Sequence, residues 1–288
     1  MKLFDTVTNE LIKQLEQGVA PWVKPWQSLN FQPKNIISKK PYNGINFLIL
    51  SWLGGKYDSN YWLTFNQAKQ LGGSVKRGSK AVPIVFFARK IEKGTDKQGN
   101  EVERVRGIFK EYYVFNACQC ENITIPQSEE LKPLHDGKHI ETIESFVKNT
   151  QANIVNKDKA RAFFSPSEDL INMPELKQFN SVEDYYSTLF HELTHWTGHE
   201  SRLNRLEKAF FGSHSYAKEE LVAELGSAFL CNQFQLDGKL QHASYLDSWL
   251  KVLKEDNKAI FKAASLAEKA VKLLSNPEPI DINITKAA

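Results

Sequence analysis

The pattern His-Glu-x-x-His occurs at His191, Glu192 and His195. On a helix, histidines four residues apart lie one turn apart on the same side, so both imidazoles could bind one metal ion. The glutamate between them could take a proton from water whose pKa a bound Zn²⁺ lowers to about 7. We therefore interpret His191 and His195 as ligands of Zn²⁺, or of another divalent metal, and Glu192 as the catalytic base of a hydrolase.

The segment around this pattern predicts the helix that such chemistry requires. Ser181 begins it as an N-cap followed by two acidic residues, and Gly198 supplies a stop. Apolar residues recur between these ends at helical spacing and cluster on one side. His191, Glu192 and His195 are predicted to lie on the other side.

The third metal ligand is less constrained, because several residues are candidates. Gly198 matches the glycine of an extended HExxHxxGxxH motif, but the final position of that motif is Ser201. His199 would lie about 12 Å from His191 along a continued helix. That distance is too long for a shared metal unless Gly198 breaks the helix.

A second predicted helix, over residues 216–230, supplies the preferred candidate, Glu220. Glu220 and Glu224 are one turn apart on a common face, so one could bind the metal while the other accepts an N–H from a ligating histidine. We assign the metal to Glu220 and the supporting role to Glu224. Glu219 and Glu224 remain alternative ligands, and all three acids could simply solvate the helix. Residues 162–164 and 170–173 predict strands beside this site, where an edge strand could align an extended peptide.

Length and charge divide the chain into two parts. Its 288 residues exceed the roughly 100–200 of a typical domain. Residues 1–125 carry 18 Lys+Arg and 10 Asp+Glu, whereas residues 126–288 carry 19 and 24. We predict an α+β fold of two domains: a small mixed α/β domain at 1–125, a linker at 126–139 and a helix-rich domain at 140–288.

The first part combines positive charge with aromatic side chains. Residues 21–90 hold eleven basic residues, one acid and four of the six tryptophans. This combination suits single-stranded nucleic acid, because basic groups neutralise phosphates and each base stacked on a ring contributes roughly 1–3 kcal/mol. The competing interpretation is that the tryptophans form a core. The candidate DNA contacts are Trp22, Trp26, Tyr42, Asn46, Trp62, Lys76, Arg77 and Lys80.

Local patterns predict the helices and strands of this first part of the chain. Apolar spacing predicts a helix from Phe4 to Leu15, and residues 61–67 are expected to open a short helix that ends at the glycine pair 72–73. Residues 82–87 and 104–115 predict two strands, with the turn residues of a hairpin between them.

Composition also excludes several classes of protein. The chain has no apolar run of about 18 residues and no signal-peptide pattern, so we expect no membrane association. Its three cysteines, Cys118, Cys120 and Cys231, are too few for a disulfide framework and suit a reducing cytoplasm.

Taken together, the motifs resemble one known family. Residues 190–203, FHELTHWTGHESRL, and 216–224, YAKEELVAE, are similar to the zincin-like metallopeptidase domain of ArdC antirestriction proteins. Residues 21–26, 42–46 and 61–67 resemble the single-stranded-DNA-binding domain of that family, which also begins some plasmid-borne primases. The resemblance covers nearly the whole chain in the family's order. The family's metal site carries over onto His191, His195 and Glu220, with Glu192 as base.

The resemblance implies a protein of a plasmid or other mobile element that shields DNA entering by conjugation from host restriction. Its implied partners are single-stranded DNA and an unidentified protein substrate, for which the host restriction machinery is one candidate source. Because the chain ends soon after the helical region, a stand-alone antirestriction protein is expected rather than a primase. Two other functions remain open: a single-stranded-DNA-binding protein with a structural metal and no proteolysis, and a generic cytosolic zinc peptidase.

Overall fold

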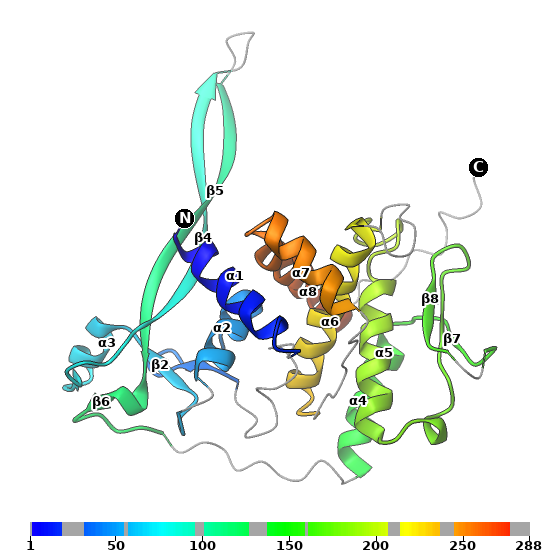
Figure 1. The fold of residues 1–288 in the computed structure, drawn as a ribbon, viewed down its shortest axis with the longest axis horizontal. Helices are drawn as coiled ribbons and strands as arrows, with labels where there is room; N and C mark the ends of the chain where they lie inside the picture. The colour runs from blue at the N-terminus through cyan, green and yellow to red at the C-terminus, as the bar shows by residue number, and fades with distance from the viewer. Residues whose placement is uncertain are drawn as a thin grey trace. The chain divides into compact units, whose positions relative to one another are not determined.

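The computed structural model describes residues 2–18, 32–54, 57–95, 101–126, 137–158, 161–206, 214–236 and 245–276. The chain forms two compact units, one of Gln32–Glu129 with Met1 and one of Lys2–Phe31 with Glu130–Ala288. The first is a mixed α/β unit and the second is rich in helices (Figure 1). The predicted α+β fold class is therefore confirmed. Most of the predicted linker, residues 127–136, lies outside the described residues.

The N-terminal helix belongs to the second unit, so the compact units differ from the predicted range 1–125. This helix, α1 (Lys2–Leu15), confirms the predicted periodicity and packs on the helices near the C-terminus. The Phe4 ring meets the Phe261 ring edge-on at 4.6 Å, and Thr8 Oγ1 donates to the carbonyl of Asn257 at 2.8 Å. Spacing showed that α1 has an apolar face but could not show which surface covers it, because that contact spans about 250 residues.

The first unit is built on a four-stranded sheet. Its strands, in spatial order, are β1 (Lys34–Asn35), β2 (Tyr61–Leu63), β5 (Glu101–Asn116) and β4 (Val82–Thr95). β1 and β2 are parallel, and the other neighbours are antiparallel. β4 and β5 form a long two-stranded hairpin (Figure 1), which confirms both predicted strands and extends them.

Short elements complete this unit. They are α2 (Gly44–Gly54), α3 (Phe65–Gln70), the paired strands β3 (Ser74–Val75) and β6 (Cys120–Glu121), and the 3-10 helix η2 (Ala117–Gln119). The short helix predicted from residue 61 begins only at Phe65, because residues 61–63 form β2. Thr64 caps it: the Thr64 hydroxyl accepts from the Gln67 backbone N–H, and the Gln67 side chain accepts from the Thr64 backbone N–H.

The second unit packs helices against a small sheet. The sheet order is β7 (Ile154–Val155), β9 (Leu170–Asn172) and β8 (Phe163–Ser165). The helices after α1 are α4 (Gly137–Asn149), the 3-10 helix η3 (Leu176–Gln178), α5 (Val182–Trp196), α6 (His214–Gln233), α7 (Leu246–Glu255) and α8 (Ala259–Ser275). The predicted strands near residues 162–164 and 170–173 are confirmed. So is the N-cap, because Ser181 Oγ accepts from the Asp184 backbone N–H at 3.0 Å.

Two small residues allow α5 and α6 to approach closely. A Cβ at Gly226 would lie 2.4 Å from Thr194 Oγ1 and 2.5 Å from Thr194 Cγ2, so only glycine fits. Two turns of α5 earlier, Ser227 Oγ donates to the carbonyl of Ser187 at 2.7 Å. This contact fixes the height of α6 along α5, and with it the alignment of the acids of α6 with the histidines of α5.

The cysteines and the hydropathy of the helices are the remaining features of the fold. The three cysteines are free, with Cys120 and Cys231 buried and Cys118 partly exposed. Burial raises the pKa of Cys231 to about 12. Among the helices that the structure describes, none is long and apolar enough to cross a membrane.

Candidate metal centre

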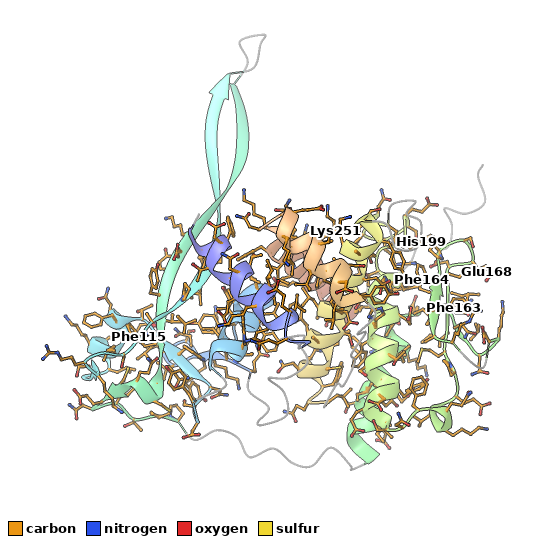
Figure 2. The ribbon with its side chains drawn as sticks, viewed as in Figure 1. Phe115, Phe163, Phe164, Glu168, His199 and Lys251 are labelled. Atoms are coloured by element: carbon orange, nitrogen blue, oxygen red, sulfur yellow. The ribbon has the colours of Figure 1, made fainter. Side chains whose placement is uncertain are left out.

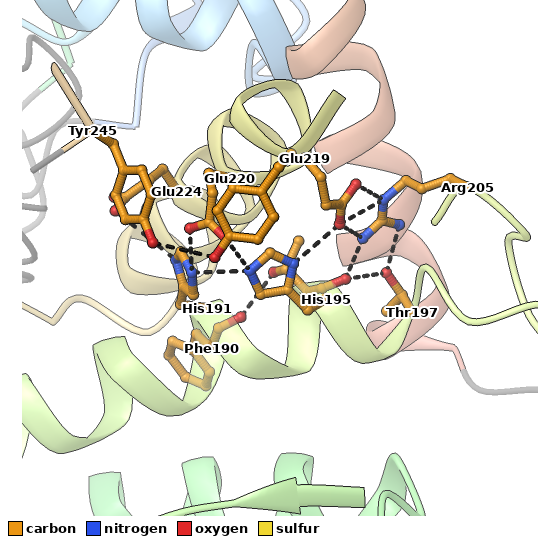
Figure 3. Close-up of polar contacts among 11 residues, drawn as sticks. Phe190, His191, His195, Thr197, Arg205, Glu219, Glu220, Glu224 and Tyr245 are labelled. Atoms are coloured by element: carbon orange, nitrogen blue, oxygen red, sulfur yellow. Dashed lines mark hydrogen bonds and ion pairs between the residues drawn. The ribbon is translucent and has the colours of Figure 1, made fainter. Parts of the chain in front are cut away.

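Three predicted ligands meet at one point between α5 and α6. His191 Nε2 and His195 Nε2 are 3.1 Å apart, and each lies 3.4 Å from an oxygen of Glu220. Figure 3 shows the two imidazoles and this carboxylate facing one another. The structure thus brings together the three residues that the sequence selected, two from one helix and one from the next.

The spacing of these atoms fits a metal ion. A tetrahedral ion with bonds of about 2.0–2.1 Å has ligand atoms about 3.3–3.4 Å apart, close to the separations of 3.1 and 3.4 Å found here. Two imidazole nitrogens and a carboxylate oxygen are also a donor set that suits Zn²⁺ and other divalent transition metals. The residues therefore fit a divalent ion with one coordination position left for water or substrate.

Burial and neighbouring charges shift the pKa values of Glu220 and His195. Burial alone would raise the pKa of Glu220, but hydrogen bonds and positive charge from His191 and His195 hold it well below its usual range. Burial alone would lower the pKa of His195, but hydrogen bonds to Glu219 and Glu220 and their negative charge raise it to about 10. A proton therefore occupies this centre in the absence of metal, and a metal ion would replace it.

A carboxylate lies behind each histidine. His195 Nδ1 donates to Glu219 Oε1 at 3.1 Å, while Glu224 Oε1 lies 3.9 Å from His191 Nδ1, beyond ordinary hydrogen-bond length. The sequence assigned the supporting role to Glu224 and weighed Glu219 only as a competing ligand. In the structure Glu219 has the direct contact with an imidazole, and Glu224 is buried beside the other.

Arg205 holds Glu219 in place. Its guanidinium, largely buried, donates to both carboxylate oxygens of Glu219 and to Thr197 Oγ1, the last at 2.8 Å, and also contacts the carbonyl of Thr194. Arg205 was not predicted as a site residue, because it belongs to no metal-binding motif. Its only signal was a basic residue following a glycine-containing helix end, a very common pattern.

Gly198 allows the chain to return to this arginine. A Cβ at Gly198 would lie 2.9 Å from the Leu206 side chain and 3.1 Å from Arg205 Cζ. The backbone N–H of Arg205 donates to the Gly198 carbonyl at 3.0 Å. Residue 198 is therefore glycine because the turn after α5 folds back too tightly for a side chain there. This tight turn brings Arg205 to Glu219.

His199 and Ser201 lie away from the ligand set. His199 Nδ1 is 2.8 Å from Ser201 Oγ, and the His199 ring packs edge-on against Phe164 at 6.3 Å. Figure 2 shows His199 and Phe164 together near β8. Among the described residues, the group of His, Cys, Asp and Glu side chains able to hold a metal is His191, His195 and Glu220.

The centre opens into a cleft of about 830 Å³ within the second unit. Glu192, only 8% exposed, lines it together with Phe163 and Phe164, which belong to the edge strand β8. Tyr216 and Tyr245 line the same cleft with their hydroxyls 3.2 Å apart, and burial raises the pKa of both. These tyrosines were not singled out as site residues, because their approach to Glu220 depends on the packing of α6 and the start of α7.

Two predicted DNA contacts have roles in packing. Trp62 is 1% exposed, so its indole is not available to stack on a base, and its predicted role is corrected. Asn46 bonds the backbone of Val85 twice: its Nδ2 donates to the carbonyl at 2.6 Å and its Oδ1 accepts from the N–H at 2.8 Å. Asn46 thus fixes α2 to β4. Composition could not separate these packing roles from binding roles.

The other predicted DNA contacts differ in accessibility. Lys76, Arg77 and Lys80 are exposed around the turn between β3 and β4. Tyr42 is half-buried, and its hydroxyl accepts from Asn35 Nδ2 at 3.3 Å. Trp22 and Trp26 lie outside the described residues.

Comparisons with known proteins agree with the geometry of both units. A family model for a zincin-like metallopeptidase matches residues 141–266, and a model for the N-terminal domain of anti-restriction factor ArdC matches residues 1–115. The crystal structure of metal-free antirestriction protein ArdC from plasmid R388 is 38% identical, covers 95% of this chain and 97% of that chain, and superposes with a TM-score of 0.77. The chain belongs to the ArdC family. The family resemblance that was inferred from the sequence is thereby confirmed.

Further ArdC-like relatives were found. The Mn(II)-bound structure of the R388 protein is 37% identical, covers 94% of this chain and 96% of that one, and has the same TM-score of 0.77. Protein y4eC of Sinorhizobium fredii is 33% identical over 92% of this chain and 89% of its own length. DNA primase TraC of Escherichia coli is 38% identical over 92% of this chain, which spans only 26% of that primase. The zincin-like family model implies a divalent metal, and the R388 protein has a Mn(II)-bound structure.

Proposed function

We propose that this ArdC-family chain is a zinc-dependent metallopeptidase that also binds single-stranded DNA and protects DNA of a plasmid or other mobile element from host restriction. The observation that carries the peptidase assignment is the convergence of His191, His195 and Glu220 beside Glu192 at an open cleft. A structural metal site would have its fourth position closed by a further protein ligand. The cleft therefore supports catalysis.

Different residues of the chain would have different roles in peptide hydrolysis. A divalent ion bound by the two histidines and Glu220 would supply Lewis-acid chemistry, lowering the pKa of water and polarising the peptide carbonyl. The Glu192 carboxylate would hold the proton taken from the attacking water and pass it to the leaving amine. Glu219 and Arg205 orient the His195 imidazole, and the main chain of β8 offers an edge along which an extended peptide can pair.

The DNA-binding part of the proposal rests on the first unit. The match of residues 1–115 to the N-terminal ArdC domain supports it, as does the excess of eleven basic residues over one acid in residues 21–90. Exposed Lys76, Arg77 and Lys80 provide contacts for phosphates. We propose that the protein acts in the cytoplasm, where it meets entering DNA, and that its protein substrate is found there, with the host restriction machinery as one candidate.

The test is protection of unmodified DNA that enters a restricting host. Wild type is compared with Glu192→Ala at matched protein levels, and with Glu200→Ala as a control, because Glu200 is an exposed acid on the turn after α5. We expect Glu192→Ala to lose protection while keeping its affinity for single-stranded DNA, and Glu200→Ala to protect fully. Full protection by Glu192→Ala would contradict a role for proteolysis.

That contrary outcome would favour the binding-protein alternative, in which DNA coating protects and the metal only stabilises the fold. Chelation should then unfold the second unit, which circular dichroism would detect. A generic cytosolic peptidase would instead bind single-stranded DNA and an unrelated polyanion such as heparin equally well at moderate salt.

A further inference from the structure

The β4–β5 hairpin carries three aromatic side chains that are about half exposed to solvent. Phe86 is 56% exposed, Tyr112 43% and Tyr113 55%. Their neighbours Ile84, Val85 and Val114 are buried and already anchor the base of the hairpin. Exposed aromatic groups that do not contribute to a core are typical of binding surfaces.

The strand register separates these rings onto two faces. Phe86 pairs with Lys110 and Ile84 pairs with Tyr112, so Phe86, Lys110 and Tyr112 share one face, which we call the Phe86 face. The rings of Phe86 and Tyr112 contact each other edge-on at 6.0 Å. Tyr113 pairs with Pro83 on the opposite face.

Charge follows the same division. The pairing of β4 with β5 continues without a bulge from Val82 to Thr95, so alternate register positions belong to alternate faces. On the Phe86 face, the charged side chain that the structure describes is the exposed Lys110, which is basic. On the opposite face, the charged side chain described is Glu111, which is acidic.

On the opposite face, Tyr113 is hydrogen-bonded to an acidic residue. The Tyr113 hydroxyl donates to Glu111 Oε1 at 2.5 Å, which keeps a carboxylate beside that ring. A polyanion would be repelled there. The Phe86 face has the opposite character, since exposed Lys110 is the cross-strand neighbour of Phe86.

We propose that the Phe86 face of the β4–β5 hairpin is a base-stacking surface for single-stranded DNA, with Phe86 and Tyr112 as the rings and Lys110 as a phosphate contact. Unpaired bases offer faces that stack on aromatic rings, whereas the bases of a duplex are already stacked on one another. The positive charge of Lys110 on this face, against the carboxylate of Glu111 on the other, favours a polyanion over a protein partner. This inference rests on the proposed DNA-binding function and names the surface that performs it.

The experiment measures fluorescence anisotropy of labelled oligothymidine, about 20 nucleotides long, with the full chain at about 50 and about 200 mM salt. We expect Phe86→Ala and Tyr112→Ala each to weaken binding roughly fivefold to a hundredfold, as for one lost stacked base, and Phe86→Trp to retain affinity. Lys110→Ala should weaken binding and reduce the dependence on salt by roughly one phosphate contact. Tyr113→Ala is the matched control, because it removes an equally exposed ring from the opposite face and should bind as wild type.

The outcomes separate this inference from the proposed function. Wild-type binding that Phe86→Ala and Tyr112→Ala leave unchanged, or that Tyr113→Ala weakens equally, would overturn the Phe86 face while leaving DNA binding intact. If wild type does not bind the oligonucleotide at all, the DNA-binding function itself fails. Thermal unfolding of each variant establishes that its fold is kept, and Phe86→Trp provides a second test in which the ring persists.

Discussion

Glu219 Oε1 lies 3.1 Å from His195 Nδ1, on the side of the imidazole opposite the nitrogen that faces Glu220. Because Glu219 is itself held by the largely buried guanidinium of Arg205, the imidazole is fixed in the tautomer that leaves Nε2 free for a metal. A series of contacts therefore positions the metal centre. Arg205, on the turn after α5, contacts Glu219 of α6, and Glu219 contacts His195 of α5.

We predict that Glu219→Gln weakens metal binding about 10- to 100-fold, because loss of the carboxylate removes the group that orients His195. Arg205→Lys should have a smaller effect in the same direction, since lysine cannot donate to both oxygens in a fork. Affinity for Zn²⁺ and Mn²⁺ can be measured by competition with a chromogenic chelator. Glu200→Gln serves as the control, and equal affinity of Glu219→Gln and wild type would contradict the role of Glu219.

The effect of pH on stability should differ between metal-free and metal-loaded protein. In the metal-free protein the pKa of His195 is raised from 6.5 to about 10. Protonation therefore stabilises the fold fully below pH 6.5, and this contribution is lost as pH rises towards about 10. Metal binding needs neutral imidazole, so apparent metal affinity should rise over the same interval.

The measurement is the difference in Tm between chelated and metal-buffered protein across that pH interval. We expect the difference to increase with pH. Glu219→Gln removes one of the groups that raise the pKa of His195, so its difference should change less steeply. A difference that stays constant, or that shrinks as pH rises, would show that His195 does not carry the proton in the metal-free state.

Gly226→Ala should destabilise the protein although alanine is the better helix former. Helix propensity alone favours the change by about 1 kcal/mol, whereas overpacking against Thr194 costs roughly 1–3 kcal/mol. We expect a net loss in free energy of unfolding, measured with urea, together with weaker metal binding because α6 shifts along α5. Adding Thr194→Ala removes the two shortest contacts and should restore part of both losses. Stabilisation by Gly226→Ala would contradict the close approach.

The three thiols should differ in reactivity. Cys231 is fully buried beside Ser227, and burial raises its pKa to about 12, while burial also raises the pKa of Cys120. We expect a chromogenic disulfide reagent at neutral pH to modify Cys118 first in the native protein and all three thiols only in denaturant. Cys118→Ser should abolish the fast phase. A fast reaction of Cys231 would indicate that α6 opens locally.

Local sequence was enough where the determining contacts are close along the chain. Ser181 and the apolar spacing after it specified α5, and the i,i+4 relation of His191 and His195 follows from helix geometry alone. Runs of β-forming residues likewise located parts of β4 and β5. The short helix after residue 61 was placed too early because pairing with β5 overrides the local pattern in residues 61–63.

Burial was the main property that composition left undecided. Trp62 and Asn46 have residue types suited to DNA contact, yet one is in the core and the other fixes α2 to β4. Phe86 and Tyr112 were not selected, because a phenylalanine or tyrosine in a strand resembles any core residue until the sheet shows which face is covered. The face that carries each ring depends on register, which is a long-range property.

The sequence by itself determined the chemistry available to this chain: two imidazoles one turn apart on one helix with a carboxylate between them, and a choice of acids on another helix. Only the tertiary structure decided how those acids divide their roles, because the packing at Gly226 and Thr194 sets the alignment of α6 against α5. It places Glu220 at the ligand atoms and Glu219 behind His195, and it brings Arg205 back to hold Glu219. Spacing along a helix is a local property of the backbone, whereas the match between two helices depends on side chains that meet only after folding.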